Sequence, residues 1–471
     1  MKTLVMKFGG TSVGSADAIS QAVALIAEHA PAWDQTAVVV SAMRGVTDAL
    51  IEGAVTAARG DDQTYRGIVS DLRVRHTLEV AGLLADPATR TSLLREIDTY
   101  LDEYSAFCRS VHVLGEVTTR AMDTISSLGE RINARIVAAR LQQEGMSSQA
   151  VDATEIIVTD DCFQQAVPLM KPTRERVQQR LVPLMQAGIV PVVTGFMAAT
   201  IDGITTTLGR GGSDYSASIL GAALDASEVW TWTDVDGVLT ADPRIVPDAR
   251  IIPELSYTEV GELAYFGAKV LHPKTIRPVV EQNIPLWVKN TFNPACPGTR
   301  IVSQPKSTPG TVKAVTAIHG LSMVTVEGRG MMGVPGIAAR TFAAVASQGT
   351  NVLMISQASS EQSICFVIPT VDVAKVIAAL EEEMALELAR RDIDRVWSMD
   401  DIVIVSAVGA GMRGTPGVAA RLFTALSSAH INVIAIAQGS SECSISLVID
   451  AGQATQAVRQ IHSEVINHES A

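Results

Sequence analysis

The chain has 471 residues, of which 47% are hydrophobic, 18% charged and only 4% aromatic, and it contains 35 glycines. This composition excludes a disordered chain, a disulfide scaffold and a coiled coil, and the length predicts two or more domains. The formal charge of −13 argues against nucleic acid or an anionic membrane as the main partner, so an anionic substrate would require basic residues concentrated in one site.

Cysteine usage and the apolar segments bear on the compartment. The five cysteines are scattered and form no C-x-x-C pair, so we predict neither a disulfide framework nor a zinc site. The N-terminal residues up to Lys7 lack the apolar core of a signal peptide. The uncharged stretch from Leu181 to Ile201 is broken by prolines and glycines, which favours a helix end, a turn and a buried strand over a membrane span. We expect a soluble, cytoplasmic protein.

Short apolar segments alternate with helical stretches in the first part of the chain. This alternation predicts βαβ connections and an α/β fold with a mainly parallel sheet and helices on both faces. A charged stretch from about Asp61 to Arg140 has few glycines and predicts a helical excursion from that sheet. The candidate strands are Leu4–Phe8, Ala37–Ser41, Gln149–Asp152, Val190–Phe196, Glu228–Thr233 and Pro285–Lys289.

A segment rich in proline, glycine and serine, from Asn293 to Gly310, predicts a linker, and it places the domain boundary near residue 305. An internal repeat follows. Residues 328–340 (GRGMMGVPGIAAR) return as residues 409–421 (GAGMRGTPGVAAR), and residues 355–361 (ISQASSE) return as residues 436–442 (IAQGSSE). The offset of about eighty residues predicts a small βαββαβ module used twice, over about 318–395 and 400–471.

Both repeats contain a G-x-G-x-x-G pattern after a strand, as a dinucleotide-binding fold does. Such a fold also needs a carboxylate at the end of the next strand to bind the ribose. Here the corresponding strands end in Gln357 and Gln438, and each repeat is too short for two mononucleotide-binding halves. We therefore interpret the repeats as paired modules that sense a small ligand.

Three patches of the first domain combine glycines with charged residues. The first runs from Lys7 to Gly14 (KFGGTSVG), at the end of a strand and the start of a helix. Glycines let backbone N–H groups approach a phosphate, a helix N-terminus adds partial positive charge, and Lys7 supplies a full charge. The alternative is a tight turn with a surface lysine, although Lys7 falls within a buried strand pattern, where an unpaired ammonium is costly. The sequence contains no P-loop motif.

The second patch is residues 207–214 (TLGRGGSD), where Arg210 could clamp a carboxylate and Asp214 could organise cations around a phosphoryl group. The third covers residues 231–244 (TWTDVDGVLTADPR), followed by residues 266–269 (FGAK), and suits nucleotide binding at a sheet edge. An ordinary capped turn is the alternative in both cases. Residues 41–47 (SAMRGVT) and 127–130 (SLGE) are weaker candidates, since such segments are more often caps or solvated turns.

The sequence shows no Ser/His/Asp arrangement, no histidine cluster for a metal and no kinase-type catalytic base. Phosphoryl transfer to a carboxylate needs no base, because the nucleophile is already an anion at neutral pH. Catalysis then reduces to positioning and charge neutralisation, with Lys7 on the phosphoryl group and Mg²⁺ bridging the phosphates of ATP.

These motifs resemble the aspartate kinase family in type and in order: residues 7–14, 41–47, 208–214 (LGRGGSD), 233–237 (TDVDG) and 266–273 (FGAKVLHP). The resemblance implies an amino-acid kinase fold over 1–305, a regulatory pair of ACT modules over 306–471, and phosphorylation of L-aspartate by ATP with Mg²⁺. It makes Lys7 and Asp214 the catalytic pair and assigns aspartate binding to Ser41, Thr47, Glu130, Arg210, Gly211 and Ser213. It places the nucleotide beside Lys7, Phe8, Gly9, Gly10, Thr233, Asp234, Leu239, Arg244 and Lys269. Leu239 stands where the family often has tyrosine, so a ring contact to the nucleotide is lost or replaced.

The repeats are most similar to the ACT pairs of bifunctional aspartokinase–homoserine dehydrogenases, which respond to threonine. The resemblance implies threonine as the effector, with lysine as the alternative, bound by Asn351, Gln357, Asn432 and Gln438. A chain ending near residue 471 leaves no room for a dehydrogenase, so we expect a single-activity kinase. Pairing of ACT modules between chains implies a homo-oligomer, and in the family one module is interrupted by the other.

Two other functions remain open on the sequence. The chain could be another amino-acid or carboxylate kinase of the same fold, which a panel of acceptor acids would distinguish. It could also be a non-catalytic amino-acid sensor on a degenerate kinase scaffold, although the presence of Lys7, Arg210 and Asp214 argues against this.

Overall fold

The computed structural model describes residues 1–267, 271–306, 311–332, 334–357 and 362–467, and they form two compact units. The first unit comprises Met1–Val238, Pro253–Tyr257 and Leu271–Pro305. The second comprises the described residues of Leu239–Ile252, Thr258–Val270 and Lys306–Ala471. The second unit thus takes in two segments that precede residue 305 in the chain.

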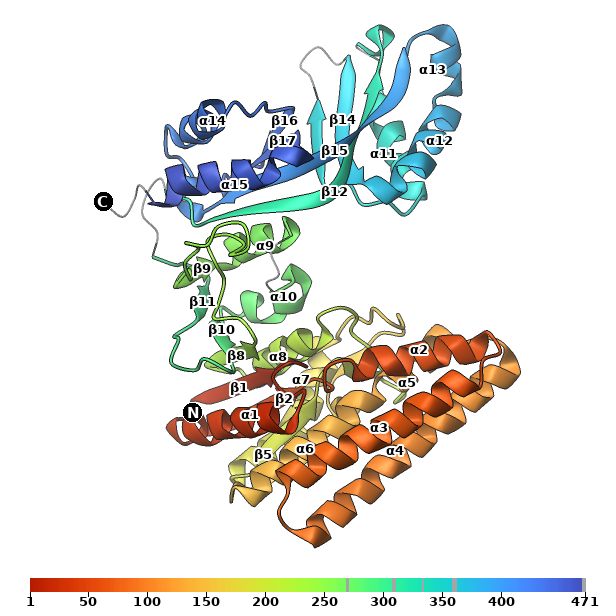
Figure 1. The fold of residues 1–471 in the computed structure, drawn as a ribbon, viewed down its shortest axis with the longest axis vertical. Helices are drawn as coiled ribbons and strands as arrows, with labels where there is room; N and C mark the ends of the chain where they lie inside the picture. Colours follow the sequence, from red (N-terminus) through yellow and green to blue (C-terminus); the bar gives the residue numbers. More distant parts are fainter. Residues whose placement is uncertain (268–270, 307–310, 333, 358–361, 468–471) are drawn as a thin grey trace. The chain divides into compact units, whose positions relative to one another are not determined.

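The first unit is built on an eight-stranded sheet of order β3-β5-β2-β1-β8-β10-β11-β9 (Figure 1). Every neighbouring pair is parallel except β10 and β11, which confirms the predicted mainly parallel α/β sheet. The strands are β1 (Thr3–Phe8), β2 (Gln35–Val40), β3 (Ser148–Val151), β5 (Val190–Thr194), β8 (Glu228–Thr233), β9 (Glu254–Ser256), β10 (Leu286–Asn290) and β11 (Thr299–Val302). All six predicted strands are present. The central strands β1, β2 and β5 are buried at every residue, as strands covered on both faces must be.

The predicted linker was wrong at one point, because β11 lies inside it and pairs antiparallel with β10. The segment from Thr299 to Val302 alternates buried and half-buried residues and carries two β-branched residues after Thr299, so it forms a strand between β10 and β9 although prolines and glycines surround it. A separate small sheet contains β4 (Val158–Thr159), β6 (Met197–Thr200) and β7 (Thr205–Thr207), in the order β4-β6-β7.

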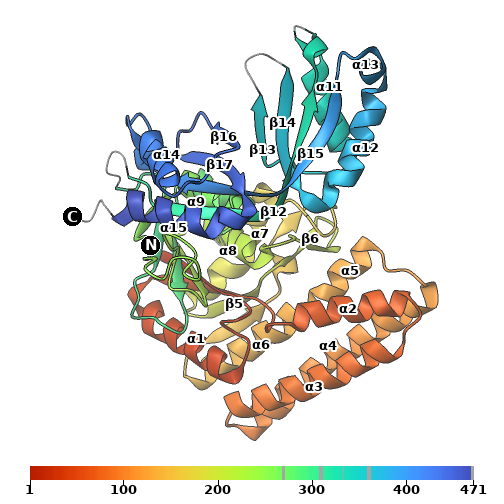
Figure 2. The same ribbon diagram turned by 45° about the horizontal axis from the view of Figure 1, so that its top comes forward.

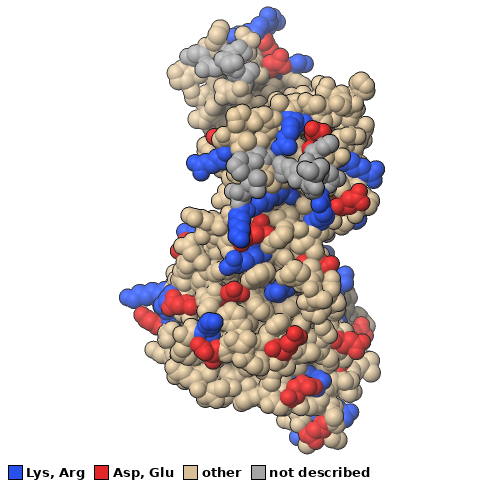
Figure 3. All heavy atoms as spheres, turned by 90° about the vertical axis from the view of Figure 1, so that its left-hand side faces the viewer, with Lys and Arg blue, Asp and Glu red and all other residues tan. Residues whose placement is uncertain are grey.

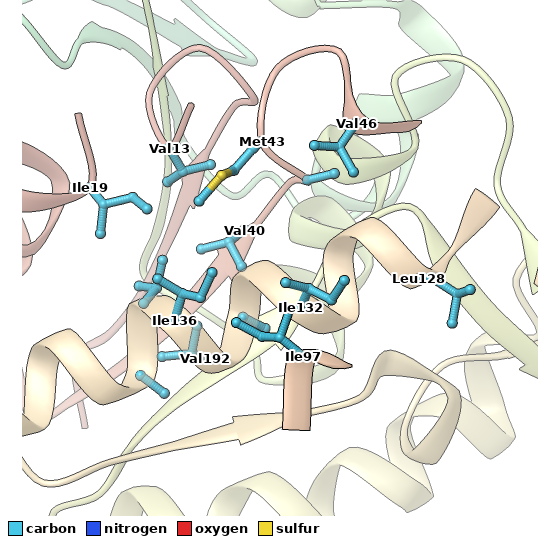
Figure 4. Packing of buried hydrophobic residues seen from close by; sticks show 14 of the residues in the cluster. Val13, Ile19, Val40, Met43, Val46, Ile97, Leu128, Ile132, Ile136 and Val192 are labelled. Atoms are coloured by element: carbon cyan, nitrogen blue, oxygen red, sulfur yellow. The ribbon is translucent and has the colours of Figure 1, made fainter. Parts of the chain in front are cut away.

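Helices cover the sheet and extend beyond it. The excursion predicted from about Asp61 to Arg140 is helical, and its two long helices α3 and α4 lie side by side in Figure 1. Figure 4 shows how α6 packs on the sheet, with Ile132 and Ile136 facing Val40 and Val192. The helices are α1 (Ala16–His29), α2 (Val46–Ala58), α3 (Gln63–Leu83), α4 (Pro87–Leu114), α5 (Thr119–Ser126), α6 (Leu128–Gln143), α7 (Met170–Gln186), α8 (Gly212–Ala223) and α10 (Pro273–Glu281).

No helix within the described ranges combines the length and the apolar character that crossing a bilayer requires. The uncharged stretch from Leu181 to Ile201 divides, as predicted, between the end of α7 and the strands β5 and β6. On the face drawn in Figure 3, acidic and basic side chains are scattered among uncharged ones, and neither sign covers the face.

The repeat forms a six-stranded antiparallel sheet of order β13-β14-β12-β15-β17-β16 in the second unit. Its strands are β12 (Ala314–Glu327), β13 (Met354–Gln357), β14 (Ser363–Pro369), β15 (Arg395–Val408), β16 (Ala435–Gln438) and β17 (Ser444–Asp450). Its helices are α11 (Ile337–Ser347), α12 (Val373–Glu383), α13 (Ala385–Arg390), α14 (Val418–Ser428) and α15 (Ala454–His462). Figure 2 separates the halves, with β13, β14, α11 and α12 at one end of the long strands and β16, β17, α14 and α15 at the other.

The two long strands β12 and β15 are shared between the modules. The second half of β12 (Leu321–Glu327) pairs with β14, and the second half of β15 (Ile402–Val408) pairs with β17. Because β12 and β15 run antiparallel, the first half of each strand completes the other module. Each module therefore has the four strands and two helices of the predicted βαββαβ unit. The first runs in that order along the chain, whereas the second takes one strand from the start of β12, so that the first is inserted into the second.

Helix α9 (Tyr257–Tyr265), apart from its first residue, belongs to the second unit, where it carries a buried ion pair. Lys313 Nζ lies 3.0 Å from Glu259 Oε2, and the Glu259 side chain is fully buried. Glu259 also accepts a hydrogen bond from the backbone N–H of Ala410, at 2.6 Å. The contact joins α9 to the start of the glycine-rich segment of residues 409–417 in the second repeat.

Replacing Lys313 by methionine removes the cation that lies against the buried Glu259 carboxylate, and we expect a loss of about 3–5 kcal/mol of unfolding free energy. Urea unfolding followed by circular dichroism measures this loss. The control is Lys375→Met, which breaks a more exposed ion pair with Asp372 in the same unit. An equal, small effect of both substitutions would show that the buried ion pair does not stabilise the second unit.

Candidate active site

Lys7 and Asp214 meet in the first unit. Lys7 lies in β1 and is 6% exposed, and Asp214 lies in the first turn of α8. The Nζ atom of Lys7 is 2.7 Å from Oδ1 of Asp214. Successive residues of a strand alternate between its faces, so Lys7 points toward α8 while the neighbouring Phe8 packs in the core against Trp232. The ring of Phe8 is therefore fully buried, and this residue offers a ligand only its backbone.

The glycine loop of residues 9–14 packs closely against residues 41–47, one of the two weaker candidate segments. A Cβ on Gly10 would lie 3.0 Å from the carbonyl oxygen of Ala42, and a Cβ on Gly14 would lie 2.8 Å from that of Gly10. The backbone N–H of Arg44 donates to the Gly10 carbonyl at 3.2 Å. A side chain at position 10 would press on the neighbouring segment, and one at position 14 would collide with the carbonyl of Gly10 in the same loop, so both positions favour glycine.

Arg75 of α3 connects these two loops and was missed by the sequence analysis. Its guanidinium donates to the carbonyl of Arg44 at 2.9 Å and to the carbonyl of Gly14 at 3.0 Å. The two acceptors are 31 and 61 residues away in the chain, so no local motif could have indicated this contact. The helical excursion therefore supports the loops at the carboxyl end of the sheet.

Helix α6 holds the peptide between Ser41 and Ala42 with two side chains. Glu130 Oε1 accepts the N–H of Ala42 at 3.3 Å, and Asn133 Nδ2 donates to the carbonyl of Ser41 at 2.6 Å. Ser213 Oγ donates to Ser41 Oγ at 3.3 Å, which brings the N-terminus of α8 to the same place. Asn133 is a second residue that the sequence analysis missed. Thr47 follows in the first turn of α2, where it is half-buried.

Glu130 is the unusual group of this cluster. It is 2% exposed, and its Oε2 has no hydrogen-bond partner in the part of the chain that the structure describes. Burial raises the pKa of its carboxyl to about 8, against the opposing hydrogen bond from Ala42. The carboxyl is thus poised to ionise when a cationic group comes within reach.

Arg210 projects from the loop before α8. Gly209 and Gly211 flank it with φ angles of +77° and +71°, the left-handed region that glycine adopts without strain. The arginine is exposed, and among the described residues no acid forms an ion pair with it. Its guanidinium is therefore available to a carboxylate ligand. Ser213 is 9% exposed and lies against Gly195, where a Cβ would come within 2.7 Å of the serine Cβ.

The nucleotide candidates are divided between the two units. Thr233 ends β8, next to the end of β1, and its hydroxyl donates to Asp234 at 3.2 Å. Leu239 and Arg244 belong to the second unit, where the Arg244 guanidinium pairs with Asp242 at 2.6 Å. Lys269 lies outside the described residues, as do Gly333 and residues 358–361 of the repeat. The structure therefore gathers Lys7, Gly9, Gly10, Thr233 and Asp234 in one unit, and it describes Leu239 and Arg244 in the other.

Among the effector candidates, Gln357 lines a cavity of about 320 Å³ in the first module, together with residues around Pro335 and the start of α11. Asn351, Asn432 and Gln438 are exposed, and none of them lines this cavity. Gln357 and Gln438 occupy equivalent ends of β13 and β16, the two edge strands of the sheet.

Comparison with known proteins agrees with this arrangement. The profile of the amino acid kinase family matches residues 2–290, and an ACT domain profile matches residues 324–384 and 405–465. The chain is 39% identical over 464 residues to bifunctional aspartokinase/homoserine dehydrogenase 1 of Zea mays, covering 98% of this chain and 50% of the relative. It spans about half the length of this and similar bifunctional relatives.

Two further proteins match over most of both chains. Aspartokinase 1 of Arabidopsis thaliana is 33% identical, with 98% of this chain and 79% of the relative covered. The crystal structure of E. coli aspartokinase III in complex with aspartate and ADP superposes with a TM-score of 0.80 at 28% identity, covering 98% of this chain and all of the other. The chain therefore belongs to the amino acid kinase family and, within it, to the aspartokinases that carry a pair of ACT domains.

Proposed function

We propose that the chain transfers the γ-phosphoryl group of ATP to the side-chain carboxylate of L-aspartate and so forms 4-phospho-L-aspartate, the first step toward lysine, threonine and methionine. The observation that carries the proposal is the ion pair of Lys7 and Asp214 beside the glycine loop of residues 9–14. In the same unit, Arg210 supplies an exposed cation and Glu130 a buried acid. An amino acid with two carboxylates and one ammonium matches these charges.

The nucleotide site fits a polyphosphate. The loop carries glycine at positions 9, 10 and 14, and a Cβ on Gly9 would lie 3.5 Å from the Lys7 Nζ, so the ammonium lies against a glycine backbone that a phosphate could approach. Mg²⁺, held mainly through the phosphates of ATP, would neutralise their charge. Lys7 would stabilise the moving phosphoryl group, and Asp214 would hold the lysine ammonium in place by their contact. Leu239, Arg244 and Lys269 complete the proposed nucleotide contacts.

The acceptor would be oriented by the remaining residues. Arg210 would bind the α-carboxylate, Glu130 would face the α-ammonium, and Ser41, Thr47, Gly211 and Ser213 would bound the substrate between the two loops. The side-chain carboxylate attacks as an anion, so positioning and charge neutralisation suffice.

The test is turnover of ATP and Mg²⁺ with L-aspartate, with the acyl phosphate trapped by hydroxylamine as the hydroxamate. We expect hydroxamate with L-aspartate and only background with glutamate, N-acetylglutamate or other carboxylic acids. Hydroxamate with another acid, and none with aspartate, would indicate a different kinase of this fold. Its absence with every acid would favour the sensor function.

We also propose that residues 1–305 carry catalysis and residues 306–471 carry feedback regulation by an amino acid, threonine in preference to lysine. Threonine is preferred because the relatives at 37–39% identity include bifunctional aspartokinase/homoserine dehydrogenases. Lysine is the alternative because a structural neighbour at 28% identity is E. coli aspartokinase III in complex with lysine and aspartate. Asn351, Gln357, Asn432 and Gln438 are the proposed effector contacts. We further propose a homo-oligomer formed by ACT pairing, and a cytoplasmic location, for which the five unpaired cysteines are the support.

Gln357 allows a direct test of the effector site, because this residue lines the cavity of the first module. The Gln357→Ala variant should bind threonine about 2- to 10-fold more weakly in isothermal titration, the range expected for the loss of one hydrogen bond. Gln348→Ala, at the end of α11 and outside the cavity, is the matched control. Unchanged affinity in Gln357→Ala would exclude this cavity as the effector site, and tighter binding of lysine would reverse the proposed preference.

A further inference from the structure

Helix α5 buries one carboxylate completely. Asp123 is 0% exposed, and within the described ranges it forms no ion pair with a lysine or arginine. Burying an ionised carboxylate without a cation is costly unless hydrogen bonds replace the water it loses. Burial raises the pKa of Asp123, while the hydrogen bonds from Gln164 and Thr207 act in the opposite direction. The hydrogen bonds of Asp123 therefore indicate which segments this costly buried group holds in place.

The carboxylate receives hydrogen bonds from two other segments. The backbone N–H of Gln164 donates to both oxygens, at 3.1 and 2.9 Å. The backbone N–H of Thr207 donates to Oδ2 at 3.0 Å, and the Thr207 hydroxyl donates to Oδ1 at 2.7 Å. Backbone N–H groups can only donate, so the two segments together require a side chain with two acceptor oxygens. Hydrogen bonds to an ionised carboxylate are also stronger than those between neutral groups.

Both donors lead directly to the loop of Arg210. Thr207 ends β7, and Leu208 and Gly209 alone separate it from the arginine. Gly209, with its left-handed backbone, lies against Gln164, since a Cβ there would be 3.0 Å from the Gln164 carbonyl oxygen. Asp123 thus fixes the strand end and the segment that supports the loop, whereas Arg210 itself is exposed and has no such restraint.

We propose that Asp123 is a positioning residue that fixes the loop of Arg210, so that the guanidinium is held where the α-carboxylate of the acceptor binds. This proposal rests on the function proposed above. Asp123 does not touch substrate and acts only through the backbone at Thr207 and Gln164. Loss of its acceptor oxygens should therefore weaken binding of the acceptor far more than binding of the nucleotide, whose glycine loop is held by Arg75 instead.

The test is the Asp123→Asn variant, which keeps the shape but turns one acceptor into a donor that faces an N–H group. We expect KM for L-aspartate to rise about 10- to 100-fold, the effect of a small misplacement of a binding group, with KM for ATP changed less than about twofold. Thr207→Val, which removes only the hydroxyl donor, should shift KM for aspartate in the same direction by less. Asp102→Asn, an exposed residue of α4, is the control. Equal changes in both KM values, or lower stability with unchanged kinetics, would overturn the proposal.

Two further measurements separate positioning from general damage and from failure of the proposed function. In an Arg210→Ala background, Asp123→Asn should change KM for aspartate little further, because the group it positions is gone; full additivity would contradict the proposal. Amide hydrogen exchange over residues 205–213 should be faster in Asp123→Asn than in the wild-type chain. That readout needs no turnover, so unchanged exchange refutes the positioning role whether or not the chain phosphorylates aspartate.

Discussion

Replacing Lys7 by methionine is expected to lower kcat for phosphoryl transfer by about 10³-fold or more. Methionine matches the length of the lysine stem and removes only the charge. The lost ammonium is the cation that lies 2.7 Å from Asp214 beside the glycine loop, and no other described lysine or arginine pairs with that acid. Hydroxamate formation at saturating ATP and aspartate measures the loss.

Two controls accompany this prediction. Lys7→Arg keeps the charge but not the compact shape of the ammonium, so it should recover only part of the rate. Thermal unfolding of each variant checks that the nearly buried strand position tolerates the change. If Lys7→Met retains more than a tenth of kcat while folding normally, then Lys7 does not stabilise the phosphoryl group, and the charge must be neutralised by another group.

Glu130 leads to the second large effect, a pH dependence of substrate binding. Burial raises the pKa of its carboxyl from 4.5 to about 8, so the empty site holds a neutral acid at pH 7. If the α-ammonium of aspartate faces this residue, binding requires the ionised form. KM for aspartate should then fall about tenfold for each pH unit up to 8 and level off above it.

The same shift fixes the sign of the effect on stability. Between pH 4.5 and about 8 the folded chain keeps a proton on Glu130 that the unfolded chain has released. The stabilising contribution of this protonated group to the unfolding free energy is therefore complete below pH 4.5. It declines as the pH rises through that window and is absent above about pH 8. Glu130→Gln should abolish the decline and make KM for aspartate high and independent of pH. An unaltered pH profile in Glu130→Gln would assign the titration to another group.

The residues that sequence patterns identified share one property: they lie in short motifs whose neighbours in the chain carry the signal. Lys7 and Asp214 each follow or precede glycines at the end of a strand or the start of a helix, so their chemistry is visible locally. Six of the eight strands of the large sheet were found for the same reason, because continuous apolar segments bounded by turns identify buried strands.

Arg75, Asp123 and Asn133 were not found, because each is a single polar residue on a helix and acts on a backbone group far along the chain. Asp123 contacts Thr207 across 84 residues, and Asn133 contacts Ser41 across 92. No spacing rule reports such contacts. Strand β11 was missed for a different reason, since its four residues stand among prolines and glycines that favour a loop and become a strand through pairing with β10 and β9.

Each of the strands β12 and β15 contributes one half to each ACT module, and this sharing limits how the pair of modules can change in evolution. The second module is not a contiguous stretch of chain, since the first half of β12 belongs to its sheet although the whole first module lies between that half-strand and the rest. Cutting the gene between the repeats would leave both halves with an open sheet edge, and such edges invite aggregation. During synthesis the first module stays incomplete until the chain has passed Met399, its last paired residue in β15. The pair should therefore be gained, lost and transplanted in evolution only as a whole.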